Sequence, residues 1–155
     1  MPKLNFVKSA RKDNPVCLKG ESYYWWKFAF GAKQYAATRP PRSRLTQSEF
    51  FNTLWGLEDG FVPASTAEEL ASQIEQFVSE LEELRDAQEE KLGNMPESLQ
   101  ESSTGELLQE RYDGIDEWLQ EIESLDTDYD DSETTEADFC STLIEEFQGL
   151  FGSIG

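Results

Sequence analysis

With 155 residues, 37% of them hydrophobic, and ten phenylalanines, the chain is long enough for a folded domain and too apolar to be wholly disordered. Its formal net charge of −19 at pH 7 disfavours nucleic acid and anionic membranes as partners and favours basic proteins. Because the chain has no histidine and only two cysteines, Cys17 and Cys140, we expect no catalytic residue, no metal site and no cofactor.

Charge divides the chain near residue 60. Residues 1–60 carry a net charge of +5, and residues 61–155 carry −24. The predicted fold class is α+β, mainly α, with a small N-terminal β-hairpin. The predicted parts are a basic aromatic module at 1–60 with a helix at 47–57, an acidic helical hairpin at 61–125, an acidic linker at 126–136 and an amphipathic C-terminal helix at 137–155.

The basic module is predicted to begin with an arm and a β-hairpin. Residues 1–19 hold five cations and few apolar side chains, and Asp13-Asn14-Pro15 is typical of a turn. Ser22–Phe30 is rich in aromatic residues that favour strands. Gly31-Ala32 can turn the chain, so that Lys33–Thr38 returns antiparallel.

A connector and a first helix follow. Arg39–Arg44 contains consecutive prolines, which predict an extended, basic segment. Thr46-Gln-Ser-Glu49 matches a capping box, in which the threonine hydroxyl and the glutamate satisfy free backbone N–H groups. A helix from Gln47 to Leu57 would turn four apolar side chains toward a core, namely Phe50, Phe51, Leu54 and Leu57.

Two long amphipathic helices are predicted next. A second capping box, Ser65-Thr-Ala-Glu68, opens a helix that ends near Leu92, and Ser103 opens another. The first has an apolar stripe at Leu70, Ile74, Phe77, Leu81 and Leu84. The second has one at Leu107, Leu108, Ile115, Trp118, Leu119, Ile122 and Leu125. We expect an antiparallel hairpin, although the same stripes would support a homo-oligomeric coiled coil between chains.

The C-terminal part combines an acidic linker with an amphipathic segment. Asp126, Asp128 and Asp130 have the spacing of a calcium loop, but the sixth position lacks glycine and the twelfth lacks glutamate, so a solvated, mobile linker is favoured. The last segment, Ala137–Leu150, would either dock as a final helix or form a separate adhesive tail. Its apolar residues gather near one face, at Phe139, Leu143, Ile144, Phe147, Leu150 and Phe151.

Two surfaces are candidate binding sites. Aromatic faces and cations of the basic module could stack bases and hold phosphates, but a module of this size needs those aromatics as its core. The residues concerned are Trp25, Trp26, Lys27, Arg39, Arg42 and Arg44. The second candidate is the carboxylate rows of the predicted hairpin, which could imitate phosphates. These carboxylates are Glu80, Glu83, Asp86, Glu90, Glu110, Asp113, Glu117 and Glu121.

Parts of the sequence resemble a family of uncharacterised tailed-bacteriophage proteins. The resemblance lies in Gly20–Phe28, Gly31–Lys33, Pro41–Ser48 and Asn94–Arg111. It implies a phage origin and a plan of a zinc-ribbon-like module followed by helices. Many members carry cysteine pairs around the Trp-Trp hairpin, whereas this chain has only Cys17 there and Ala36, Ala37 and Thr38 in the return strand. Metal binding is therefore not implied here, and the resemblance supplies no activity.

We therefore expect a non-enzymatic phage protein that binds and modulates a basic, nucleic-acid-handling protein of the host or the phage, with DNA mimicry in counter-defence as one form of this role. The alternatives are a nucleic-acid-binding module inhibited by its own acidic tail, and a small structural or assembly protein. The chain has no run of eighteen apolar residues, and its first residues lack the apolar core of a signal peptide, so we expect it in the host cytoplasm and not in a membrane.

Overall fold

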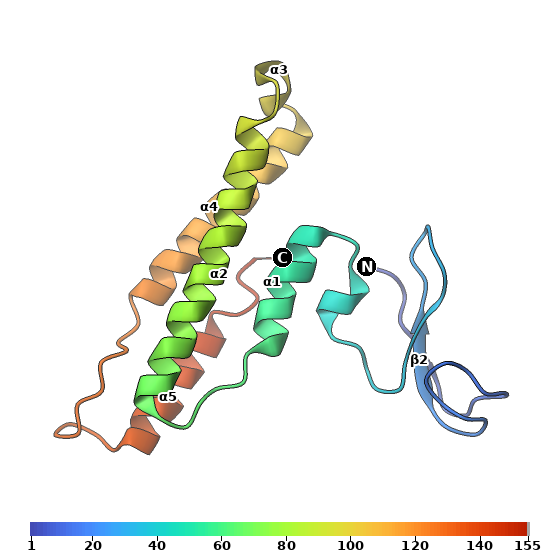
Figure 1. Cartoon of the computed structure of the whole chain (residues 1–155), viewed down its shortest axis with the longest axis horizontal. Coiled ribbons are helices and arrows are strands. Elements are labelled where there is room, and N and C mark those ends of the chain that lie inside the picture. Colours follow the sequence, from blue (N-terminus) through green and yellow to red (C-terminus); the bar gives the residue numbers. More distant parts are fainter. Residues whose placement is uncertain (155) are drawn as a thin grey trace. The chain divides into compact units, whose positions relative to one another are not determined.

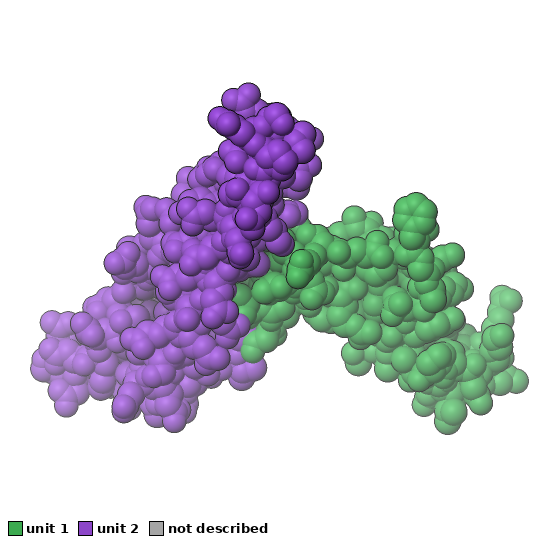
Figure 2. Space-filling model, turned by 45° about the horizontal axis from the view of Figure 1, so that its top comes forward, with its two compact units in different colours: residues 1–60 green, residues 61–155 purple. Residues whose placement is uncertain are grey.

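The computed structural model describes residues 1–154. These residues form two compact units, Met1–Gly60 and a second unit that begins at Phe61, which Figure 2 shows in green and purple. A small antiparallel sheet lies at the N-terminus and helices make up most of the rest. The predicted fold class, α+β and mainly α, is confirmed.

The first unit contains a three-stranded antiparallel sheet in the order β1-β2-β3. Figure 1 labels its central strand, β2. Its strands are β1 (Asn5–Val7), β2 (Tyr23–Trp26) and β3 (Gln34–Ala36). Strand β1 was not predicted, since residues 1–19 were expected to be an arm. Strand β3 pairs with one edge of β2, and β1 pairs with the other edge. There Phe6 lies opposite Tyr24, and their ring centroids are 4.9 Å apart.

The hairpin strands are shorter than the sequence predicted. Residues 27–33 lie outside the sheet, with Phe30 86% exposed and Gly31 at φ +132°, a conformation that glycine adopts without strain. The core of the sheet consists of Trp26, Ala36 and Leu45.

The connector and the first helix correct several predictions. Residues Arg42–Leu45 form a short 3-10 helix, η1, where an extended segment was expected. The following helix, α1 (Glu49–Gly60), starts two residues later than predicted. Ser48, and not Thr46, accepts from the backbone of the first turn, at Phe51 N, while Thr46 accepts from Ser48 N. The predicted core residues Phe50 and Leu54 are buried, but Phe51 and Leu57 are only partly buried.

The second unit is built on a helical hairpin. Helices α2 (Ala67–Gly93) and α4 (Ser103–Glu123) lie side by side, and the short helix α3 (Glu97–Gln100), which was not predicted, forms the turn between them (Figure 1). Their N-caps are Thr66 and Ser102, each one residue from the predicted start. The predicted antiparallel hairpin is therefore present within one chain.

A further helix, α5 (Glu136–Gly149), docks on this hairpin and runs parallel to α2. The Glu136 side chain accepts a hydrogen bond of 2.9 Å from Ala67 N, so the two helices start together. Farther along, the Phe147 and Phe77 rings lie 5.1 Å apart. The expected alternative of a separate adhesive tail is wrong in this structure. The aromatic core at this point consists of Phe61, Phe77, Trp118, Phe147 and Phe151.

Most of the predicted apolar stripes are buried, with a few exceptions. All five residues of the α2 stripe are buried. Of the predicted α4 stripe, four residues are buried, Leu119 and Leu125 are partly buried, and Leu107 is 43% exposed. Of the six residues predicted for the apolar face of the C-terminal segment, Leu143 and Phe147 are buried and the other four are partly buried. Cys140, which the predicted face omitted, is also buried. The α2 stripe also continues one step farther than predicted, to Gln88, which is only 1% exposed.

Candidate functional site

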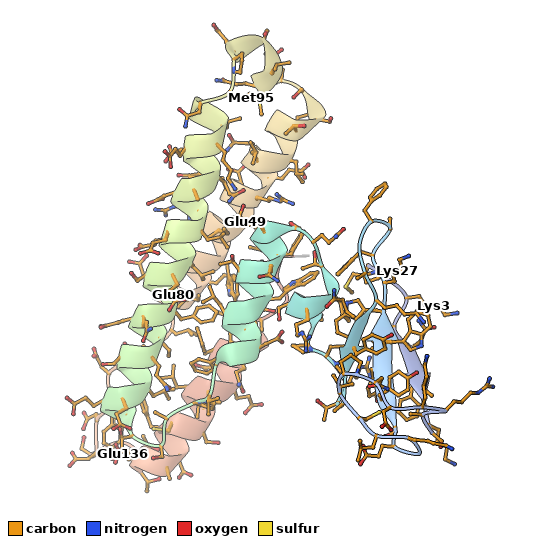
Figure 3. The ribbon with its side chains drawn as sticks, turned by 45° about the vertical axis from the view of Figure 1, so that its right-hand side comes forward. Lys3, Lys27, Glu49, Glu80, Met95 and Glu136 are labelled. Carbon is orange, nitrogen blue, oxygen red and sulfur yellow. The ribbon has the colours of Figure 1, made fainter. Side chains whose placement is uncertain are left out.

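Each set of acidic residues proposed from the sequence lies on the outer face of its own helix in the hairpin. Glu83, Asp86 and Glu90 of α2 are exposed and Glu80 is partly buried, and Figure 3 labels Glu80 on this helix. On α4, all four predicted carboxylates are exposed, at Glu110, Asp113, Glu117 and Glu121. Spacings of three and four residues keep each set on one side of its helix.

One ion pair shows how the two acidic rows are aligned. Arg85 Nη1 of α2 lies 3.2 Å from Asp116 Oδ1 of α4, and Arg85 Nη2 lies 3.0 Å from Asp86 Oδ1. Because the helices are antiparallel, this contact places Glu80 at the height of Glu121 and Glu90 at the height of Glu110. The structure thus brings the two rows into matching positions along the hairpin.

The charge density of this hairpin is high for a protein surface. Helix α2 carries nine carboxylates and two cations, and α4 carries seven and one, giving a net charge of −13. Over a length of about 40 Å at ~1.5 Å per residue, this is one net charge per ~3 Å. Duplex DNA carries one per ~1.7 Å, so the hairpin has about half the linear charge density of DNA.

Arg85 is held in this acidic setting by two carboxylates. Its hydrogen bond to Asp86 is the main cause that raises the pKa of the guanidinium above its usual value, and its bond to Asp116 acts in the same direction. Arg85 therefore remains charged and joins α2 to α4.

The aromatic and cationic residues proposed for nucleic-acid binding are mostly engaged within the first unit. Trp26 is 1% exposed and belongs to the core, so its ring cannot stack on a base. Arg42 Nη2 lies 2.7 Å from Glu58 Oε2, and the Arg42 guanidinium covers the Trp55 ring at 4.9 Å. The Arg44 guanidinium lies 5.3 Å from the Trp26 ring centroid.

The remaining three residues of that set are more accessible. Lys27 and Arg39 are exposed, and Trp25 is partly buried. The ammonium group of Lys33 covers the Trp25 ring at 4.0 Å. The cations and aromatics of this unit therefore contact one another extensively and do not form one open stacking surface.

The aspartates of the predicted linker form local turns. Asp126 Oδ1 accepts from Asp128 N at 3.0 Å and Asp130 Oδ1 accepts from Ser132 N at 2.9 Å. Hydrogen bonds from Ser132 lower the pKa of Asp130. Within residues 1–154, no three or more His, Cys, Asp or Glu side chains are placed to hold a metal ion.

An open groove between α2 and α4 was missed by sequence reasoning. It has a volume of about 500 Å³ and is lined by residues of both helices and of the segment that follows α4. Its apolar residues include Val78 and Leu119, which are partly buried. The periodicity of each helix contained part of this signal, because Val78 lies beside the α2 stripe and Leu119 belongs to the predicted α4 stripe. The sequence did not show which side of the two helices would stay uncovered.

None of the helices described for residues 1–154 is both long enough and apolar enough to cross a membrane. Comparisons of the chain with protein-family models, with curated proteins and with solved structures gave no match.

Proposed function

We propose that this chain is a non-enzymatic binding protein, of phage origin, whose acidic helical hairpin binds and inhibits a basic, nucleic-acid-handling protein of the host or the phage. The hairpin would enter the cationic site of that protein in place of nucleic acid. The observation that carries the proposal is the pair of exposed carboxylate rows that α2 and α4 hold at matching heights.

Rigidity supports this function. Both helices are anchored by buried stripes, and Arg85 links them, so the backbone positions that carry the carboxylates keep fixed spacings without a partner. A preorganised row of charges loses less conformational entropy on binding than the same charges on a mobile chain. It also attracts a cationic partner over long distances and speeds association.

Direct binding of nucleic acid by the first unit is the weaker candidate. Its positive charge of +5 is opposed by −24 on the rest of the chain. In addition, Trp26 is buried and Arg42 is paired with Glu58. A mobility-shift assay of the full chain with single- and double-stranded DNA and RNA tests this alternative, and binding that is lost in Lys27→Ala/Arg39→Ala would support it.

The proposed function is tested by capture followed by competition. The immobilised chain is used to capture its partner from host cells, and the chain is then titrated into a complex of that partner with a fluorescent DNA duplex. We expect displacement of the duplex. The variant Glu80→Gln/Glu83→Gln/Glu110→Gln/Glu117→Gln should bind about 30-fold more weakly at low salt, if each exposed charge contributes about 0.5 kcal/mol.

A matched variant controls for the loss of charge alone. Four exposed glutamates outside the two rows are replaced instead, in Glu97→Gln/Glu101→Gln/Glu145→Gln/Glu146→Gln. This variant should bind with nearly the affinity of the original chain. If the two quadruple variants bind equally, the acidic rows are not the binding surface, and if the duplex is not displaced, mimicry of nucleic acid is wrong.

A further inference from the structure

We infer that the groove between α2 and α4 is a docking site for a basic, amphipathic helix of the partner protein. This inference rests on the proposed function, because it assumes a basic protein partner. It adds which part of that partner the chain recognises. The groove has an apolar floor and an acidic rim, and both features constrain the occupant.

The floor of the groove is apolar along both helices. Val78 and Leu119 expose part of their side chains there, between more deeply buried isoleucines. The floor consists of Ala71, Ile74, Val78, Leu119, Ile122 and Leu125. Apolar side chains entering this groove would remove further hydrophobic surface from water, at about 25 cal/mol per Å².

The rim of the groove is acidic. Glu75 and Glu82 of α2 and Glu123 of α4 are exposed along its edges, and Asp116 is held by Arg85 and by Gln120. An occupant must therefore combine an apolar ridge with flanking positive charges. A second copy of this chain would bring like charges together at this rim, which disfavours it.

The geometry favours a helical occupant over an extended strand. Backbone groups of α2 and α4 are bonded within their own helices and offer no edge to which a strand could be added. From Ala71 to Arg85 the groove follows α2 for about 21 Å at ~1.5 Å per residue. A partner helix of about 14 residues, with apolar side chains at every third or fourth position and lysine or arginine beside them, fits this length.

The test uses a labelled 14-residue peptide of leucine and lysine with one helical apolar stripe. Its control is a peptide of the same composition in which the stripe is scrambled. Fluorescence anisotropy with the full chain at physiological salt should show at least tenfold tighter binding of the striped peptide. Equal binding of the two peptides would overturn the groove inference and leave charge attraction intact, whereas binding of neither would also count against the proposed preference for basic partners.

Variants separate the floor from the rim. Val78→Gln/Leu119→Gln should reduce the affinity for the striped peptide about tenfold, to that of the scrambled one, and Glu75→Gln/Glu82→Gln/Glu123→Gln should weaken both. The control Glu97→Gln/Glu145→Gln/Glu146→Gln removes the same charge elsewhere and should leave the striped peptide's affinity within about twofold. If the floor variant binds the striped peptide as the original chain does, the groove is not its site.

A measurement on the unaltered chain guards against variants that fail to fold. Ile74 and Ile122 line the groove, whereas Ile144 of α5 does not. In methyl NMR spectra, the striped peptide should shift the signals of Ile74 and Ile122 and leave that of Ile144 in place. Shifts of Ile144 without those of Ile74 and Ile122 would contradict docking in the groove.

Discussion

At the residue scale, Gln88 is a polar residue at a buried position of the apolar α2 stripe. It occupies the next position of the α2 stripe after Leu84, and its side chain is 1% exposed. Its Nε2 donates to Leu84 O at 3.1 Å, but its Oε1 has no hydrogen-bond partner among the described residues. A buried acceptor without a partner costs about 1–3 kcal/mol.

Gln88→Met should therefore stabilise the second unit by about 1 kcal/mol, since it keeps the volume and removes the unsatisfied oxygen. Chemical denaturation followed by circular dichroism measures the change. Gln76→Met, at an exposed position of the same helix, is the control and should lie within about 0.5 kcal/mol of the original chain. A loss of stability in Gln88→Met would mean that the oxygen has a partner such as a buried water.

At the element scale, the turn between α2 and α4 depends on the close approach of Gly105 to α3. A Cβ atom at this position would lie 1.9 Å from the carbonyl oxygen of Gln100, and this oxygen is part of the backbone. Gly105 N also donates to the N-cap Ser102 Oγ at 3.4 Å. The turn and the first residues of α4 cannot separate without losing both contacts.

Gly105→Ala should consequently destabilise the hairpin by about 2–3 kcal/mol, because the backbone must move to admit the methyl group. Gly114→Ala is the matched control within the same helix. Its Cβ would meet only the flexible Ile154 side chain, at 3.5 Å, and alanine favours a helix interior by up to ~1 kcal/mol. Thermal unfolding of the two variants should shift in opposite directions, and equal shifts would show that the turn tolerates a rearrangement.

The elements also differ in how far the sequence could predict them. The five-residue stripe of α2 was predicted completely, because a period of three and four over many turns leaves one buried face. Helix starts were less certain, because Thr46 and Ser48, or Ser65 and Thr66, are both chemically able to cap. Strand β1 has three residues and pairs with a distant strand, so no local pattern marked it.

Of the candidate sites, the acidic rows could be predicted from local sequence periodicity, whereas the groove depends on how distant segments pack together. The exposure of the acidic rows follows from helix periodicity, and the structure places them as expected on the outside. The groove depends on which side of α2 and α4 remains uncovered when α5 and Phe151 pack against Phe77. That docking is a tertiary event, so the groove could not be derived from spacing alone.

At the scale of the whole molecule, charge segregation should make stability depend on salt. The second unit carries a net charge of −24, and like charges on its helices repel one another. The compact state holds these charges closer together than the unfolded chain does. The Debye length falls from about 30 Å at 0.01 M salt to about 10 Å at 0.1 M, so added salt screens most of this repulsion.

We therefore expect the thermal midpoint of helix unfolding to rise by several degrees between 10 mM and 300 mM NaCl, in circular dichroism at pH 7. The reason is that about 1 kcal/mol of relieved repulsion shifts the midpoint of a unit of this size by roughly 4–8 °C. The variant Glu80→Gln/Glu83→Gln/Glu110→Gln/Glu117→Gln carries less negative charge. Its thermal midpoint at 10 mM NaCl should therefore be higher than that of the original chain, and the rise of the midpoint with salt should be smaller. A midpoint that falls with salt would show that attractive ion pairs, such as Arg85 with Asp116, outweigh the repulsion between the acidic rows.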